Sequence, residues 1–248
     1  MTSDTPLYLD LLKKVLTNVI YEGAPFARGQ ATGYDLRARA EGRDWPQVAR
    51  TMVDLRRLDN VQACVEAVLR DGVPGDLIET GVWCGGVCIF MRGILAAHGC
   101  TDRTVWVADS FQGIPETTAA SHACDQQVGL HRANGVLAVS LAAVQDNFAH
   151  YGLLDEQVRF LPCWFKDSLP AAPVERLAVL RLDGDLYEST MVALDHLYPK
   201  LSPGGFVIVD DYCLPGCREA VHEFRARHGI DDRIEPIDDA GVYWRRAA

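Results

Sequence analysis

Leu177-Ala-Val-Leu-Arg-Leu-Asp183-Gly-Asp185 and Gly204-Gly-Phe-Val-Ile-Val-Asp210-Asp211 are two short apolar runs that each end in a pair of acids. Each run is predicted to form a β-strand that ends where its acids begin. The segment 187–201 between them carries apolar residues at helical spacing, which predicts a strand–helix–strand unit with parallel strands. Both acid pairs then lie at the carboxyl edge of one sheet, where open α/β sheets bind ligands.

The acids at these two strand ends are Asp183, Asp185, Asp210 and Asp211. They would repel one another unless a cation lay between them, and their hard oxygens suit Mg²⁺, Ca²⁺ or Mn²⁺ better than zinc. Alternatively, Asp183 and Asp210 are ordinary strand-end or helix-capping acids. That alternative requires two neighbouring strands to end in acids by accident, so we favour a divalent metal site.

The pattern around this unit alternates strand and helix from residue 75 onward. Strands are expected at 77–79, 104–108 and 158–161, helices at 87–98 and 136–151, and a closing hairpin at 233–244. Residues 1–70 are expected to form a helical lid region, with helices at 7–19 and 45–68, ahead of a catalytic region at 71–248. We therefore predict one continuous α/β domain with a doubly wound, mostly parallel sheet, an N-terminal helical extension and a C-terminal hairpin.

Composition narrows the possible partners. The chain has 248 residues, a 48% apolar fraction and a net charge of −10, which argues against a nucleic-acid partner because such proteins need a basic stripe. No apolar run approaches the roughly 20 residues of a membrane span, and the first 21 residues lack the basic start of a signal peptide. The eight cysteines show no metal-ligand spacing, so free thiols in a reducing cytoplasm are simpler than a structural zinc site.

A glycine-rich turn, Glu79-Thr-Gly81-Val-Trp-Cys-Gly85-Gly86, follows the first predicted strand. Such a turn suits a nucleotide-like ligand, but the spacing of a dinucleotide fingerprint is absent. Glu79 would repel a pyrophosphate and suits the positive groups of S-adenosylmethionine. Asp109, at the end of the next strand, suits the ribose hydroxyls. The alternative is a tight turn with a capping acid and no ligand.

Seven segments carry a resemblance to a known family. They are Glu79-Thr-Gly-Val-Trp-Cys-Gly-Gly, Val105-Trp-Val-Ala-Asp-Ser-Phe, Trp164-Phe-Lys-Asp-Ser-Leu-Pro, Leu180-Arg-Leu-Asp-Gly-Asp, Val209-Asp-Asp-Tyr-Cys, Arg218-Glu-Ala-Val-His and Gly241-Val-Tyr-Trp-Arg-Arg. Together they resemble the macrocin O-methyltransferase family. The resemblance implies a class I, Rossmann-like methyltransferase that uses S-adenosylmethionine and Mg²⁺ to methylate a deoxysugar hydroxyl of a macrolide or aminocoumarin antibiotic.

The resemblance also implies roles for individual residues. It implies metal ligation by Asp183, Asp210 and Asp211 and a base role for Asp185. The residues that it places at the cofactor are Glu79, Thr80, Gly81, Val82, Gly85, Asp109, Ser110, Asp167 and Ser168. This sequence departs from the family at Cys84, where an arginine is common, and it matches least well at 24–40 and 114–134.

The expected chemistry agrees with these roles. A sugar hydroxyl is a poor nucleophile, so a metal must acidify it while a base takes its proton. Asp185 is the expected base, and His131 is the competing candidate. Tyr34 and His131 are candidate substrate contacts, although Tyr34 could equally pack a helix or a dimer contact and His131 could be a surface residue. The segments 23–33 and 113–134 are expected to close as lids over the substrate.

Two other functions stay open from the sequence. A catechol-type methyltransferase would use the same fold and metal on a planar aromatic diol. A non-catalytic binder of S-adenosylmethionine or of a glycoside would be expected to have lost some of the metal acids, and all four are present. We favour an enzyme that acts on a small-molecule glycoside as a cytoplasmic homo-oligomer, with no nucleic acid or membrane as partner.

Overall fold

A computed structural model describes residues 4–26, 33–126 and 128–247. The helices in these residues are α1 (Asp4–Leu16), α2 (Leu36–Ala40), α3 (Leu55–Arg70), α4 (Gly86–Ala97), η1 (Leu130–Ala133), α5 (Asn134–Leu137), α6 (Leu141–His150), α7 (Phe165–Ser168), α8 (Tyr187–Leu197), η2 (Tyr198–Lys200) and α9 (Pro215–His228). The strands are β1 (Asp76–Thr80), β2 (Val105–Asp109), β3 (Val158–Pro162), β4 (Leu177–Leu182), β5 (Leu201–Val209), β6 (Glu235–Pro236) and β7 (Val242–Arg245).

The strands form one sheet in the order β3-β2-β1-β4-β5-β7-β6. The run from β3 to β5 is parallel, whereas β7 is antiparallel to both β5 and β6. The predicted mostly parallel, doubly wound sheet and the C-terminal hairpin are therefore confirmed. Because β1 and β4 lie side by side at the centre, the loops after them meet at one edge of the sheet.

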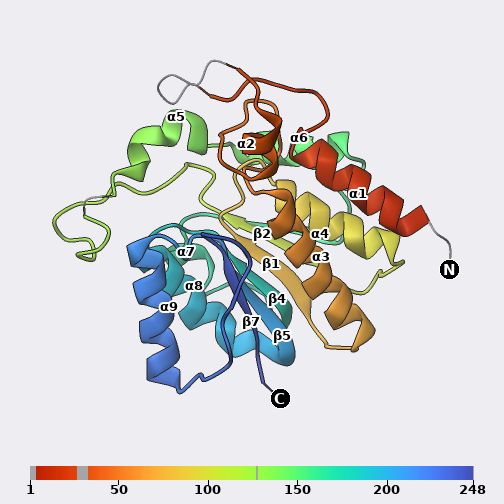
Figure 1. The fold of residues 1–248 in the computed structure, drawn as a ribbon. Coiled ribbons are helices and arrows are strands. Elements are labelled where there is room, and N and C mark those ends of the chain that lie inside the picture. The colour runs from red at the N-terminus through yellow and green to blue at the C-terminus, as the bar shows by residue number, and fades with distance from the viewer. Residues whose placement is uncertain (1–3, 27–32, 127, 248) are drawn as a thin grey trace.

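Two layers of helices cover the sheet (Figure 1). Helices α1, α3, α4 and α6 pack on one face, and α8 and α9 pack on the other. Alternate residues of each strand serve the two layers: in β2, Val105 and Val107 face the first, and Trp106 and Ala108 face the second. This period of two in buried, apolar strands is what a sheet covered on both faces requires.

The helix predicted at 45–68 begins later than its sequence pattern indicates. Helix α3 starts at Leu55, and the Asp54 side chain caps it by accepting the backbone N–H of Arg57 at 2.7 Å. The segment before it consists of turns and bends rather than helix, because Arg50 uses its backbone groups elsewhere: its N–H donates to Leu16 O at 2.8 Å, and its carbonyl accepts the Gly86 N–H at 2.9 Å. Tertiary hydrogen bonds therefore override the helical periodicity there.

The helix predicted at 136–151 is divided in two. Helix α5 ends at Leu137 and α6 starts at Leu141. Ser140 lies between them with extended backbone, and its hydroxyl accepts the Ala143 N–H at 3.2 Å. A serine with this geometry is a helix N-cap, so it starts a new helix in the middle of an apolar pattern that continues through it.

Helices α1 and α3 belong to the same core as the first helical layer of the sheet. The lid expected at 23–33 lies largely outside the described residues, which omit 27–32, and Gln127 of the second expected lid is also outside them. Among the residues that the structure describes, none of the helices has the length and hydrophobicity needed to cross a lipid bilayer.

Candidate active site

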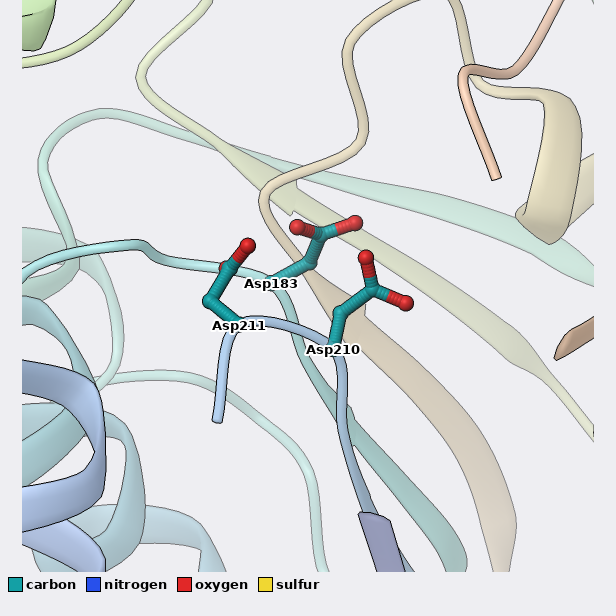
Figure 2. A group of neighbouring side chains, drawn as sticks. All are labelled: Asp183, Asp210 and Asp211. Carbon is teal, nitrogen blue, oxygen red and sulfur yellow. The ribbon is translucent and has the colours of Figure 1, made fainter. Parts of the chain in front are cut away.

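Three of the four strand-end acids converge at the edge of the sheet. Asp183 follows β4, and Asp210 and Asp211 follow β5, its parallel neighbour, with Leu182 paired to Val209 at the strand ends. One carboxylate oxygen from each acid lies within 4.8 Å of the others. Figure 2 shows the three side chains, which come from the two neighbouring strand ends. The prediction that the topology brings these acids together is confirmed.

The charges in this cluster are crowded. Burial raises the pKa of Asp183 above its ordinary value, and the negative charge of Asp210 raises it further. Burial also raises the pKa of Asp211 well above its usual range, with added repulsion from Asp185 and Asp183. Carboxylates whose ionised forms are disfavoured in this way are stabilised by a cation, and all-oxygen donors match Mg²⁺ or a similar hard ion. The three acids therefore fit a divalent metal.

Arg181 is the buried counterion of the cluster. It lies within β4 with no exposed surface, and its Nη1 donates to Asp183 Oδ2 at 2.7 Å. The same guanidinium also pairs with Glu79 on β1 and with Asp210 after β5. It therefore fixes acids from three neighbouring strands. No role for Arg181 is predicted from the sequence, although an arginine inside the apolar run 177–182 is a usable signal, because buried arginines are almost always paired.

Arg57 holds the other oxygen of Asp210. Its Nη1 donates to Asp210 Oδ2 at 2.5 Å, and its Nε donates to Asp238 Oδ2 at 2.6 Å. Asp238 in turn accepts the backbone N–H groups of Ala240 and Gly241, both at 2.7 Å. Helix α3 and the C-terminal hairpin are thus both tied to the acid cluster. Nothing in the sequence indicated this role, because Arg57 is one of several arginines on an amphipathic helix.

Replacing Arg57 with methionine is expected to lower the free energy of unfolding by about 1–3 kcal/mol, because two largely buried acids lose charged hydrogen bonds. Urea denaturation followed by circular dichroism measures this. The matched control is Arg70→Met, because Arg70 at the end of α3 is largely exposed and pairs with the partly exposed Asp71, and such surface pairs contribute ~0–1 kcal/mol. Equal effects of the two variants would contradict the role given to Arg57.

Asp185 stands beside the cluster on the turn before α8. Its backbone N–H donates to Asp211 Oδ2 at 3.0 Å, and its φ of 58° is left-handed, a conformation that aspartate and asparagine tolerate better than most residues. Burial raises the pKa of Asp185 to about 8, and the charges of Asp183 and Asp210 add to the effect. The result is a carboxylate more basic than an exposed aspartate.

The loop between β1 and α4 is held in place by Asp109. Asp109 Oδ2 accepts the Val82 N–H at 2.7 Å, and Oδ1 accepts the Phe111 N–H at 2.7 Å. Burial raises the pKa of Asp109, although these backbone hydrogen bonds favour its ionised form. Gly81 has a φ of 86°, and a Cβ there would lie 1.8 Å from the carbonyl oxygen of Asp183. Only glycine lets this loop lie so close to the acid cluster.

Glu79 is paired with buried groups of the protein and also belongs to the active site. It is 1% exposed, it pairs with Arg181, and it accepts a hydrogen bond from the Cys88 thiol at 2.8 Å. Burial raises the pKa of Glu79 to about 7, and the positive charge of Arg181 opposes this rise. Glu79 therefore connects the loop after β1 to the same buried guanidinium that holds the acid cluster.

A single cavity of about 610 Å³ connects this loop to the acids. The predicted site residues that line it are Glu79, Gly81, Val82, Asp109, Ser110, Asp183, Asp185, Asp210 and Asp211. Its apolar wall includes Trp45, Met52, Trp83, Leu130, Leu137 and Trp164. No feature of the sequence indicated that Met52 or Leu137 lies at the site, since both belong to segments predicted as helix. The volume of the cavity lies within the ~300–1,000 Å³ that is typical of ligand-binding pockets.

Other predicted residues are not among those that line this cavity: Thr80, Gly85, Tyr34, His131, Asp167 and Ser168. Tyr34 donates its hydroxyl to Val19 O at 3.1 Å, which is the packing alternative for this residue. His131 lies in η1, and its Nδ1 is buried without a hydrogen-bond partner in the described part of the chain. Ser168 donates to Trp164 O within its own turn at 3.2 Å.

Comparisons with known proteins agree with this architecture. Residues 5–246 match the family described as Macrocin-O-methyltransferase (TylF). The 8-demethyl-8-(2,3-dimethoxy-alpha-L-rhamnosyl)-tetracenomycin-C 4'-O-methyltransferase of Streptomyces olivaceus is 64% identical over 250 residues, covering 100% of this chain and 96% of that protein. The Mycinamicin III 3''-O-methyltransferase of Micromonospora griseorubida is 61% identical over 246 residues, covering 98% of this chain and 97% of that protein.

A solved structure gives the same answer for the fold. The structure of the O-methyltransferase NovP superimposes with a TM-score of 0.95 at 57% sequence identity, and the match covers 99% of this chain and 100% of that chain. The family match spans nearly the whole chain, and the relatives are similar over their full lengths. The chain therefore belongs to the macrocin O-methyltransferase family and is an O-methyltransferase.

Proposed function

We propose that this protein transfers a methyl group from S-adenosylmethionine to a deoxysugar hydroxyl on a macrolide- or aminocoumarin-type glycoside, with Mg²⁺ held by Asp183, Asp210 and Asp211. The observation that carries the proposal is that one cavity joins this acid cluster to the loop between β1 and α4. The name of the Streptomyces olivaceus relative specifies a rhamnosyl group on its acceptor, which supports a glycoside as substrate.

The acid cluster would supply the chemistry at the acceptor hydroxyl. When bound there, a divalent cation lowers the pKa of a hydroxyl as a Lewis acid. Asp185 is the residue that we propose takes the proton, because it lines the cavity and its backbone N–H donates to Asp211, which places it beside the acid cluster. Arg181 and Arg57 keep Asp210 in place. The apolar wall excludes water from the reacting oxygen.

The loop after β1 would hold the cofactor. Asp109 and Ser110 line the cavity beside Val82, and we propose that they bind the ribose hydroxyls. Glu79 would face the positive groups of S-adenosylmethionine while Arg181 holds its other side. We propose that the other residues assigned to the cofactor by resemblance support these loops from outside the cavity wall: Thr80, Gly85, Asp167 and Ser168.

The test is a methylation assay with S-adenosylmethionine and MgCl₂, followed by mass spectrometry. The acceptors are deoxysugar glycosides, including a rhamnosyl one, and a simple catechol, each with and without EDTA. Methylation of a glycoside that stops in EDTA supports the proposal. Methylation of the catechol alone would replace it with the catechol-type alternative. Cofactor binding without turnover on either acceptor would indicate a non-catalytic binder.

Asp109→Ala is expected to weaken S-adenosylmethionine binding by about 1–3 kcal/mol, because charged hydrogen bonds to the ribose and to the loop N–H of Val82 are lost. Isothermal titration calorimetry with S-adenosylmethionine measures this. Asp146→Ala is the matched control, since Asp146 is an exposed aspartate on α6. Unchanged affinity in Asp109→Ala, or tighter binding of NADH than of S-adenosylmethionine, would refute the cofactor assignment.

We also propose that the protein is a homo-oligomer. Leu7 and Leu11 on α1 are 69% and 53% exposed, and Tyr21 and Val48 are 73% and 57% exposed. All four belong to the N-terminal region 1–70, and we propose that they contribute to the surface through which the subunits associate. Light scattering coupled to gel filtration gives the oligomeric state, and a monomer at micromolar concentration would contradict the proposal.

All eight cysteines are free thiols, which is compatible with the cytoplasmic location that we propose.

A further inference from the structure

Asp125 joins the loop 113–134 to helix α8. This helix directly follows the turn that carries Asp185, which we call the catalytic turn. Asp125 is 1% exposed, and it lies in the segment 113–134, which was expected to be a mobile lid. Its Oδ1 accepts the backbone N–H of Tyr187 at 3.0 Å, and its Oδ2 accepts that of Glu188 at 3.4 Å. These are the first two N–H groups of α8, which have no partner inside the helix.

Helix α8 depends on this contact because it has no cap of its own. Its N-cap residue is Leu186, whose side chain makes no capping hydrogen bond. Asp125 supplies the missing carboxylate from 62 residues earlier in the chain, and a negative charge at a helix N-terminus is favourable. Since α8 begins two residues after Asp185, the loop and the catalytic turn are fixed to each other.

Two further contacts hold the loop at the same place. The ring of His122 stacks on that of Tyr187, with centroids 3.6 Å apart and planes at 9°, and the Tyr187 hydroxyl donates to Glu223 on α9 at 2.6 Å. At Gly216, in the first turn of α9, a Cβ would lie 2.4 Å from Asp125 Oδ1. The middle of the loop is therefore packed between the N-terminal ends of α8 and α9.

The fixed loop forms part of the cavity wall. Ile114, Pro115, Glu116, Ser121 and Leu130 line the cavity from this segment. Glu188 and Ser189 line it from α8, next to Asp185. The loop between β1 and α4, by contrast, is held by Asp109. Asp125 itself lines the cavity, and its carboxylate bonds to the start of α8 beside the turn that carries Asp185, whereas the cofactor loop is held by a different carboxylate.

We propose that Asp125 is a positioning residue that locks the segment 113–126 to α8, and that this anchor shapes the acceptor side of the cavity. The inference rests on the proposed function for its catalytic part and on the contacts above for its structural part.

The experiment compares Asp125→Ala with Asp125→Asn, because asparagine caps helices about as well as aspartate. In Asp125→Ala, amide hydrogen exchange over 115–126 and 186–190 should become roughly 3- to 30-fold faster, the range expected for loss of a cap. The KM for the glycoside should rise by a similar factor, with the S-adenosylmethionine Kd unchanged. Asp125→Asn should restore most of both properties.

Ser140→Ala is the matched control, since it removes the cap of α6 but should leave exchange at 186–190 and the acceptor KM unchanged. If Asp125→Ala fails to fold, His122→Ala tests the same anchor by removing the ring stacked on Tyr187. Wild-type exchange in the variants would overturn the anchor, and faster exchange with an unchanged KM would overturn its role at the acceptor. If the wild-type protein methylates no glycoside, the proposed function fails, whereas hydrogen exchange still decides the anchor.

Discussion

Asp185→Asn is expected to lower kcat by ~10²–10⁴ while Mg²⁺, S-adenosylmethionine and glycoside bind almost normally. Asparagine keeps the size of the side chain and tolerates the left-handed φ of 58° at this position, so the turn before α8 is preserved. The hydrogen bond from its backbone N–H to Asp211 is also preserved. Only the proton acceptor is lost. Steady-state kinetics with saturating metal and cofactor measure the effect.

The matched control for this result is Asp195→Asn, a change of the same chemistry on the outer side of α8, where Asp195 pairs with Arg227. It should leave kcat near the wild-type value. The competing base is His131, whose buried Nδ1 has no partner in the described part of the chain. If Asp185→Asn keeps near wild-type kcat and His131→Ala is inactive, the base is the histidine.

The second large effect is expected at the metal site. Asp211→Asn should weaken divalent-metal binding by at least ~10–100-fold, because loss of a residue that merely supports a metal ligand already costs that much. Turnover at physiological Mg²⁺ should fall accordingly. Titration with Mn²⁺ followed by electron paramagnetic resonance measures the affinity without need of an acceptor. Asp195→Asn again serves as the control.

Asp211 is a better choice for this test than Asp210. Removing the Asp210 carboxylate would leave the guanidinium groups of Arg57 and Arg181 without one of their partners, and breaking a buried ion pair in this way destabilises a protein by ~3–5 kcal/mol. A loss of activity in that variant could then come from unfolding. Full wild-type activity in the presence of EDTA would remove the metal from the mechanism.

The ion pairs that hold the acids of the active site in place could not be predicted from the sequence. Arg181 pairs with Glu79 across 102 residues of chain, and Arg57 pairs with Asp210 across 153. An arginine on an amphipathic helix can reach many acids, and only the packing of α3 against the sheet selects Asp210 and Asp238 as the partners of Arg57. The same holds for the non-helical segment before Leu55, where the hydrogen bonds of the Arg50 backbone to Leu16 O and from the Gly86 N–H replace the helix that local periodicity favours.

The sequence by itself determined the strands of the sheet, the strand–helix–strand unit and the meeting of Asp183 with Asp210 and Asp211. These features follow from the apolar periodicity of short stretches of sequence. They also follow from the rule that neighbouring parallel strands place their carboxyl ends at the same edge of the sheet. The tertiary structure alone decided which cations hold the acids, which loop caps α8 and where the cavity lies. Those features depend on contacts between distant segments, whose partners are selected by burial and strand order rather than by spacing in the sequence.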